Sequence, residues 1–199
     1  MKCFYCDFTA FSGQNASTDR YVAAVLAEAD LYPGTEVDTL YMGGGTPTEL
    51  SAPQLKALLE GAARRFGPLK ALRESTVEAS PESASEDKLD VLAAAGVGRL
   101  SFGLQTASDT LLKSVGRHHT FADFAGVYRA AKLRGFAMNV DLMQGLPGQT
   151  LADVKSDLEA VLALEPDHLS VYTLQVEDRT QFAKREVELD TDFAREAMD

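Results

Sequence analysis

The chain has 199 residues, a formal net charge of −11, 45% hydrophobic residues and 25% charged residues, which is typical of a globular domain with one sizeable core. The acidic balance argues against general nucleic-acid binding, because the phosphates require a basic face. No run approaches the roughly 18 apolar residues that span a bilayer. The start, Met1-Lys2-Cys3, lacks an apolar stretch of signal-peptide length. We therefore expect a cytoplasmic protein with no membrane segment and no nucleic-acid partner.

The two cysteines of the chain lie together in Cys3-Phe4-Tyr5-Cys6-Asp7-Phe8. In a reducing compartment a Cys-x-x-Cys pair indicates a metal or redox site rather than a structural disulfide. Thiolates select zinc, copper(I) or iron–sulfur clusters, and a cluster needs more than two ligands. A third cysteine at the spacing Cys-x3-Cys would fall just before Met1, so we expect the chain to begin inside a cluster motif. Free thiols or adventitious zinc are the alternatives.

Five short runs rich in Val, Leu, Tyr and Phe alternate with amphipathic segments, which predicts repeated β-α units and a parallel sheet. The predicted strands are Val37–Met42, Ser75–Ala79, Arg99–Leu104, Met138–Met143 and His168–Leu174. No linker or low-complexity tract interrupts the pattern. We therefore expect one α/β domain over residues 1–199.

Four segments between the strands carry apolar residues at i, i+3, i+4 and i+7, the spacing of amphipathic helices. Their stripes are Val22, Val25, Leu26 and Ala29; Leu55, Leu58, Leu59 and Ala62; Phe124, Val127, Tyr128 and Ala131; and Val154, Leu158, Val161 and Leu162. Capping boxes or their Asp variants are predicted at Ser51-x-x-Gln54, Thr120-x-x-Asp123 and Thr150-x-x-Asp153. Asp190-Thr191-Asp192 is similar to a further helix cap.

Parallel α/β folds bind ligands at the carboxyl ends of their strands, so the residues there are the candidate site residues. The first strand leads into Gly43-Gly44-Gly45-Thr46-Pro47-Thr48, whose missing side chains would let a ligand meet the backbone. The segment lacks the Lys of a P-loop and the G-x-G-x-x-G spacing, so a simple tight connection stays open.

The later strand ends carry polar residues. Glu78 could hydrogen-bond a ribose hydroxyl or an ammonium group, or it could be a solvated carboxylate. Gln105 ends the third strand. Asp141 lies in an apolar run and needs a partner, either a protein group or a ligand. Arg117 could pair with a carboxylate in bidentate fashion or form a surface ion pair.

Two further segments have less specific patterns. His118 and His119 are adjacent, so their side chains tend to point apart, and His168 opens a different strand. Metal ligation by these histidines is therefore a minority interpretation. The segment from Gly145 to Thr150 is predicted to be a rigid loop that leads into the helix capped by Thr150.

Taken in order, these motifs resemble the radical S-adenosylmethionine (SAM) superfamily, specifically its oxygen-independent coproporphyrinogen III oxidase-like group. The motifs are Cys3-Phe4-Tyr5-Cys6-Asp7-Phe8, Gly43-Gly44-Gly45-Thr46-Pro47-Thr48, Val77-Glu78-Ala79-Ser80-Pro81, Ser101-Phe102-Gly103-Leu104-Gln105, Gly116-Arg117-His118-His119 and Asp141-Leu142-Met143-Gln144-Gly145-Leu146-Pro147. Cys6-Asp7-Phe8 is similar to the haem-chaperone (HemW-type) branch. The resemblance implies a partial (β/α)6 TIM-like barrel that lacks its first strand and the family's C-terminal portion.

The same resemblance implies a [4Fe-4S] cluster and SAM as cofactors. By resemblance, Cys3 and Cys6 are cluster ligands, Tyr5 packs near the adenine, and Gly44, Gly45 and Thr46 contact the methionyl part. Glu78, Gln105, Arg117 and Asp141 complete the polar lining. The implied partners are SAM, an electron donor such as a flavodoxin-type protein, and haem or porphyrin in the complete protein.

Three functions stay open at this point. The first is a radical SAM protein of porphyrin or haem metabolism. The second is a haem-binding delivery protein without SAM catalysis, and the third is an inactive barrel fragment. The absent first cluster cysteine leaves open whether this chain is an enzyme.

Overall fold

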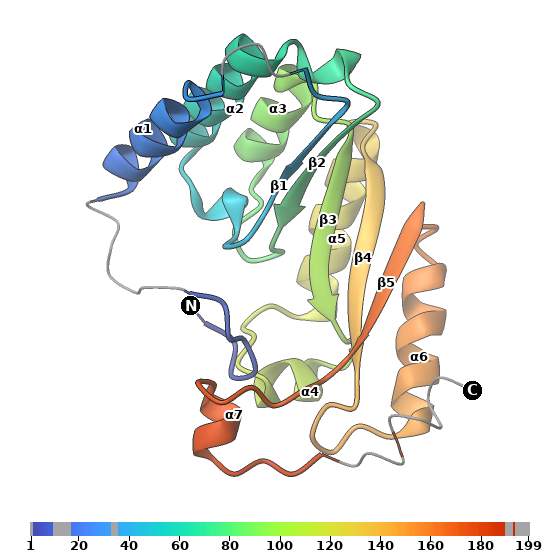
Figure 1. The fold of residues 1–199 in the computed structure, drawn as a ribbon. Helices are drawn as coiled ribbons and strands as arrows, with labels where there is room; N and C mark the ends of the chain where they lie inside the picture. The colour runs from blue at the N-terminus through green and yellow to red at the C-terminus, as the bar shows by residue number, and fades with distance from the viewer. Residues whose placement is uncertain (1, 10–16, 33–35, 190–192, 194–199) are drawn as a thin grey trace.

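The computed structural model describes residues 2–9, 17–32, 36–189 and 193, which include a five-stranded parallel sheet of order β1-β2-β3-β4-β5 (Figure 1). The strands are β1 (Thr39–Met42), β2 (Glu74–Ala79), β3 (Arg99–Gln105), β4 (Ala137–Gln144) and β5 (His168–Thr173). All five predicted strands are confirmed. The first begins two residues later than predicted, because its pairing with β2 starts at Thr39 opposite Glu74.

Helices connect the strands in the expected alternation. They are α1 (Thr18–Ala29), α2 (Ala52–Phe66), α3 (Glu86–Ala95), α4 (Asp109–Ser114), α5 (Phe121–Leu133), α6 (Leu151–Leu162) and α7 (Gln181–Lys184), with the short 3-10 helices η2 (Pro47–Glu49) and η3 (Leu69–Ala71). Both reciprocal hydrogen bonds of a capping box are present at Ser51, Thr120 and Thr150, as predicted. The predicted cap at Asp190–Asp192 lies outside the described residues.

One face of the sheet is apolar and carries the main core. Strand residues that alternate with polar ones, such as Val77, Leu100, Phe102 and Val140, are buried in one cluster with residues of α2, α3 and α5. Figure 1 shows these helices on the same side of the sheet. The helices therefore cover one face only, as in part of a barrel wall.

The predicted apolar stripe of α6 is partly wrong. Leu162 is 56% exposed, whereas Asp157 on the same helix is only 4% exposed. The reason is that Asp157 accepts hydrogen bonds from the loop after β3, which draws this polar side chain inward. The other three predicted stripes contain most of the buried residues of their helices, which also include Gly61 in α2 and Ala125 in α5.

The opposite face of the sheet is polar. Tyr41, Glu78, Ser101, Asn139 and Asp141 occupy the alternating positions of β1 to β4, and hydrogen bonds connect them along and across the strands. A parallel sheet with helices on one face and polar side chains on the other is an incomplete TIM-like barrel whose polar face is the interior. The predicted fold class is thereby confirmed.

A second, smaller apolar cluster lies at the carboxyl end of the sheet. Leu111, Val115, Leu146, Leu174 and Phe182 form its buried part, and Phe4 and Tyr5 pack against it. Figure 1 places the N-terminal loop beside α4 and α7 at this end. This cluster therefore brings the cysteine loop to the strand ends, although the loop is far from α7 in sequence.

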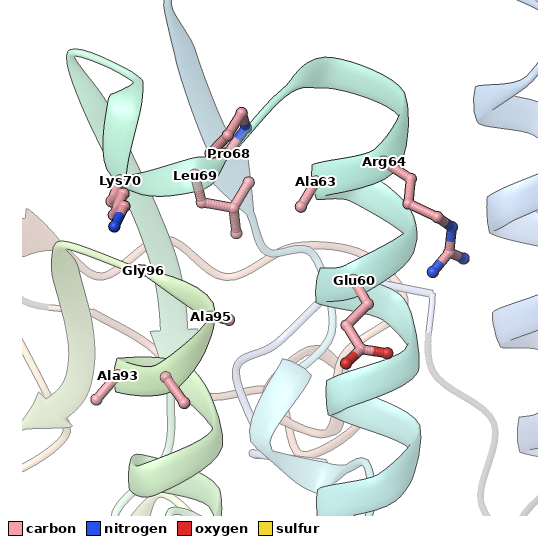
Figure 2. Close-up of a pocket in the computed structure, with 10 residues that line it drawn as sticks. Glu60, Ala63, Arg64, Pro68, Leu69, Lys70, Ala93, Ala95 and Gly96 are labelled. Carbon is pink, nitrogen blue, oxygen red and sulfur yellow. The ribbon is translucent and has the colours of Figure 1, made fainter.

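A surface pocket lies at the other end of the sheet. This open pocket has a volume of about 680 Å³ and is lined among others by Glu60, Arg64, Lys70 and Gly96. Figure 2 shows that these residues come from the C-terminal ends of α2 and α3 and the segments that follow them. Lys70 and Gly96 precede β2 and β3, so this pocket is at the amino end of the sheet. None of the predicted site residues lines it. Among the described helices, none is both long and apolar enough to cross a membrane.

Candidate cofactor site

The cysteine loop is a tight turn at the carboxyl end of the sheet. The backbone N–H of Cys6 donates to the carbonyl of Cys3 over 3.2 Å, and both thiols are free and half-buried. Burial, followed by the proximity of Cys3, raises the pKa of the Cys6 thiol above its usual value. Two thiols on one turn are suitably placed to share a soft metal centre.

Arg117 lies against this loop. Burial alone would lower the pKa of the guanidinium, but the neighbouring Cys3, Tyr5 and Glu82 raise the pKa above its ordinary value. Burial also raises the pKa of Tyr5, while the charge of Arg117 opposes this rise. In the described part of the chain, Arg117 Nε is buried without a hydrogen-bond partner. A half-buried cation with an unused, buried donor is suited to an anionic ligand.

Gln105 joins Arg117 above β3. The β3–β4 register shifts between Gly103 and Gln105, and Gln105 adopts a φ of 79°, which is uncommon for a residue with a side chain. A Cβ at Gly103 would lie 2.8 Å from Gln105 Nε2 and 2.9 Å from Arg117 Nη2. Gly103 therefore leaves the space that the two polar side chains occupy.

Glu78 holds the glycine segment after β1. The N–H of Gly44 donates to Oε2 of Glu78 over 3.1 Å, and the Tyr41 hydroxyl donates to Oε1 over 2.8 Å. A Cβ at Gly43 would come within 2.5 Å of the Glu78 carboxyl carbon, so this glycine is required for the close approach. Burial and then the Glu78 hydrogen bond raise the pKa of Tyr41 to about 12.

The glycine segment itself stays open toward the site. Gly44 has a φ of 106°, which favours glycine, and a Cβ at Gly44 or Gly45 would meet nothing within 4 Å. Thr46 is half-buried and precedes η2. Missing side chains over open space form a backbone cradle that a ligand can approach.

Asp141 is held by a polar network across three strands. Asn139 Nδ2 donates to Asp141 Oδ1 over 2.7 Å and to Ser101 Oγ over 2.8 Å, while Ser101 Oγ donates to Asp141 Oδ2 over 3.2 Å. Ser170 on β5 exchanges hydrogen bonds with the Asn139 amide. The charged residue in the apolar run is therefore satisfied by protein groups and points to the polar face.

The two adjacent histidines are anchored by Glu82 from the loop after β2. Glu82 Oε1 accepts from the N–H groups of His118 and His119, over 2.8 and 3.3 Å, and lies 3.3 Å from His119 Nδ1. Among the described residues, no group of three or more His, Cys, Asp or Glu side chains is placed to hold a metal. The histidine segment, which follows Arg117 directly in the chain, is held in place by Glu82.

The structure brings the predicted residues together as two groups at the strand ends. Cys3, Cys6, Tyr5, Arg117 and Gln105 form the first group, and the second contains the glycine segment, Glu78 and Asp141. Tyr41 lies close to both carboxylates of the second group. It donates a hydrogen bond to Glu78, and after burial the charges of Glu78 and Asp141 both raise its pKa.

Sequence reasoning missed four residues of this site: Tyr41, Glu82, Ser101 and Asn139. Three of them could have been found from the two-residue period of a strand, which places Tyr41, Ser101 and Asn139 on the polar face with Glu78 and Asp141. Glu82 carries no comparable local signal, because its partners are 36 and 37 residues away.

Comparison with known proteins identifies the family. Residues 1–161 match the model of the radical SAM superfamily. The chain is 42% identical over 185 residues to the heme chaperone HemW of Bacillus subtilis, covering 90% of this chain and 49% of that protein. It is 40% identical over 204 residues to HemW of Escherichia coli, covering 98% and 53%.

A solved structure agrees with this assignment. Coproporphyrinogen III oxidase (HemN) from Escherichia coli, a radical SAM enzyme, superimposes with a TM-score of 0.88 at 28% identity, covering 100% of this chain and 48% of that one. The chain thus spans about half the length of the relatives that it matches. On its sequence, its fold and these matches, the chain belongs to the radical SAM superfamily and resembles the HemW and HemN proteins within it.

Proposed function

We propose that the chain forms the [4Fe-4S] and SAM site of a protein that acts in porphyrin or haem metabolism. The observation that carries the proposal is the Cys3–Cys6 turn beside the half-buried Arg117, whose buried Nε has no hydrogen-bond partner among the described residues. Soft thiolates fit an iron–sulfur cluster, and a buried guanidinium fits the carboxylate of an amino-acid ligand. The names of the HemW and HemN relatives support the porphyrin or haem context.

Each residue of the first group has a proposed role. Cys3 and Cys6 hold the cluster as two of its thiolate ligands, and the cluster, when bound, supplies the electron that cleaves SAM. Arg117 pairs with the carboxylate of SAM, Gln105 stands beside it, and Tyr5 packs near the adenine. The chain itself holds these side chains in place, on the cysteine turn, at the end of β3 and after α4.

The second group has matching roles for the rest of SAM. Gly44, Gly45 and Thr46 contact the methionyl part through the open backbone cradle. Glu78 and Asp141 retain lone pairs beyond those used in the protein, because a carboxylate offers about four acceptor positions. They can therefore accept hydrogen bonds from the amino group or the ribose hydroxyls of SAM.

The test is SAM binding to the whole protein after anaerobic reconstitution with iron and sulfide. Arg117→Lys should weaken SAM binding by roughly tenfold, because a lysine cannot reproduce the planar bidentate donor. Arg134→Lys is the matched control, since Arg134 pairs with Glu86 and Asp90 on the helical side. Equal affinities for wild type and Arg117→Lys would contradict the assignment of Arg117.

The second candidate is a haem-binding delivery protein in which SAM chemistry is absent. The name of the HemW relatives, heme chaperone, favours it. A haem titration of the whole protein distinguishes the two candidates. Haem binding without any SAM binding by the reconstituted protein would support delivery alone.

Three wider assignments complete the proposal. Residues 1–199 form one radical SAM core domain, which is supported by the single sheet that the described strands make. The protein acts in the cytoplasm, which its free cysteines suit. A flavodoxin-type protein supplies the electron; reduction of the reconstituted protein by such a donor is the direct test.

A further inference from the structure

Phe4 lies between the two cysteines and is held through its backbone on both sides. Its N–H donates to the carbonyl of Val115 at the end of α4, over 3.0 Å. Its carbonyl accepts from the N–H of Phe182 in α7, also over 3.0 Å. These two hydrogen bonds tie the cysteine loop to segments that are more than 100 residues away in the chain.

The ring of Phe4 also makes close contacts with both of these segments. Phe182 meets it edge to face at 6.3 Å between ring centroids, and the Arg185 guanidinium lies 4.2 Å from the ring centroid. Gly116 also lies against the ring, since a Cβ there would come 2.8 Å from Phe4 Cε1. Gly116 also has a φ of 82°, so both its conformation and its contact require glycine.

The contact between Phe4 and Gly116 lies next to residues of the first group in both segments of the chain. Cys3 and Tyr5 are the chain neighbours of Phe4, and Arg117 is the chain neighbour of Gly116. A shift of the Phe4 ring would therefore move the thiols and the guanidinium relative to each other. Phe4 has no polar side-chain atom, so it can act on a ligand only by placing other residues.

We propose that Phe4, clamped between Gly116 and the α7 segment at Phe182 and Arg185, is the positioning residue of the cysteine loop. The segment after β5 is then part of the scaffold of the cofactor site. That the positioned thiols serve a cluster rests on the proposed function, whereas the clamp itself exists in the cofactor-free protein.

The test measures how fast a thiol reagent modifies Cys3 and Cys6 in the cofactor-free whole protein, read by mass spectrometry of the peptide that carries them. Phe4→Ala should raise both rates roughly tenfold, the effect of losing an aromatic pair and a cation–π contact together. Phe4→Tyr should restore slow modification. Phe121→Ala is the control for losing a half-buried phenylalanine elsewhere, and it should leave both rates unchanged.

A pair of glycine substitutions isolates the ring contact. Gly116→Ala and Gly135→Ala impose the same backbone strain, because their φ values are 82° and 83°, but a Cβ at Gly135 meets nothing within 4 Å. Only Gly116→Ala should expose the thiols. Arg185→Gln, an exposed change that leaves the core intact, should raise the rates roughly threefold.

The outcomes separate the two proposals. Unchanged thiol rates in Phe4→Ala, Gly116→Ala and Arg185→Gln would overturn the positioning role, even if the protein binds a cluster. Raised rates in all three would support the clamp. If the wild type with its slow thiols then held no iron after reconstitution, the proposed function would fail while the clamp stood.

Discussion

At the scale of single residues, Glu78 connects β1 and the glycine segment that follows it. It accepts hydrogen bonds from Tyr41 and from the N–H of Gly44, so it fixes the glycine segment before any ligand arrives. Because each oxygen keeps a further acceptor position, Glu78 can also accept a hydrogen bond in the role proposed for it, at the amino group or a ribose hydroxyl of SAM. Burial, together with the hydrogen bond to Glu78, raises the pKa of Tyr41.

Glu78→Gln should lower the pKa of Tyr41 below its value of about 12, since an amide removes the negative charge that disfavours tyrosinate. A tyrosine absorbance titration, with Tyr41→Phe to assign the signal, measures this change. An unchanged Tyr41 pKa in Glu78→Gln would show that burial and the charge of Asp141, and not Glu78, cause the shift.

The raised pKa of Tyr41 also makes stability depend on pH, by a small amount because the residue is 60% exposed and solvent screens its interactions. The folded state holds the phenolic proton more tightly than the unfolded state, so this stabilisation is present below about pH 10. It is lost as the pH rises toward about 12. Tyr41→Phe should therefore lose less stability than the wild type in this alkaline range.

His119 should make stability depend on pH in the acidic range. Burial and then the charge of Arg117 lower its pKa, so below about pH 6.5 the unfolded state binds more protons than the folded state. The free energy of unfolding should fall as the pH drops through this value. Glu82, whose pKa is lowered by its bonds to His118 and His119 against the effect of burial, adds a loss at still lower pH.

His119→Asn separates these two contributions. Asparagine offers a donor in place of Nδ1 but does not titrate, so the slope just below about pH 6.5 should flatten. Urea unfolding at a series of pH values measures the slope. A slope equal to that of the wild type would assign the acid sensitivity to groups other than His119.

At the scale of elements, Asp157 on α6 connects two loops of the site. Its Oδ1 accepts from the Thr106 hydroxyl over 2.9 Å and from the N–H of Ala107 over 2.7 Å. Its Oδ2 accepts from Gln149 Nε2 over 3.3 Å. Burial raises the pKa of Asp157 even though these donors lower it. One buried carboxylate thus joins the loop after β3, which follows Gln105, to the loop after β4.

Asp157→Asn should destabilise the fold by about 1–3 kcal/mol, because its new NH₂ would face the NH₂ of Gln149 and leave a buried donor unsatisfied. Gln149→Glu should recover part of this loss when combined with Asp157→Asn, since the new carboxylate accepts from the asparagine. A double-mutant cycle by chemical unfolding measures the coupling. Additive losses would contradict the proposed contact.

The sequence predicted the helices and strands more accurately than their local departures from regular structure. Hydrophobic period and capping boxes located the five strands and the starts of α2, α5 and α6, because these signals depend on neighbouring residues. The register shift at Gln105 and the burial of Asp157 depend on partners in other elements. The prediction that Leu162 lies on the buried face of α6 was wrong for that reason. The local pattern does not show that Thr106 and Ala107 donate hydrogen bonds to Asp157 and so draw it inward.

At the scale of the whole molecule, the fold gathers residues from the whole length of the chain at one end of the sheet. The family motifs predicted which residues meet there, including Cys3, Glu78, Arg117 and Asp141. They did not predict what holds these residues, since Phe4, Tyr41, Glu82 and Asn139 act through contacts across the sheet and between loops. The motifs therefore indicated the candidate site residues, and the structure showed which neighbouring side chains hold them in place.

The most direct test of the account is the iron and sulfide content of the whole protein after anaerobic reconstitution. The account predicts about four of each per chain, and a large loss in a Cys3→Ser, Cys6→Ser variant with unchanged folding. Equal iron and sulfide in the wild type and in that variant would contradict it.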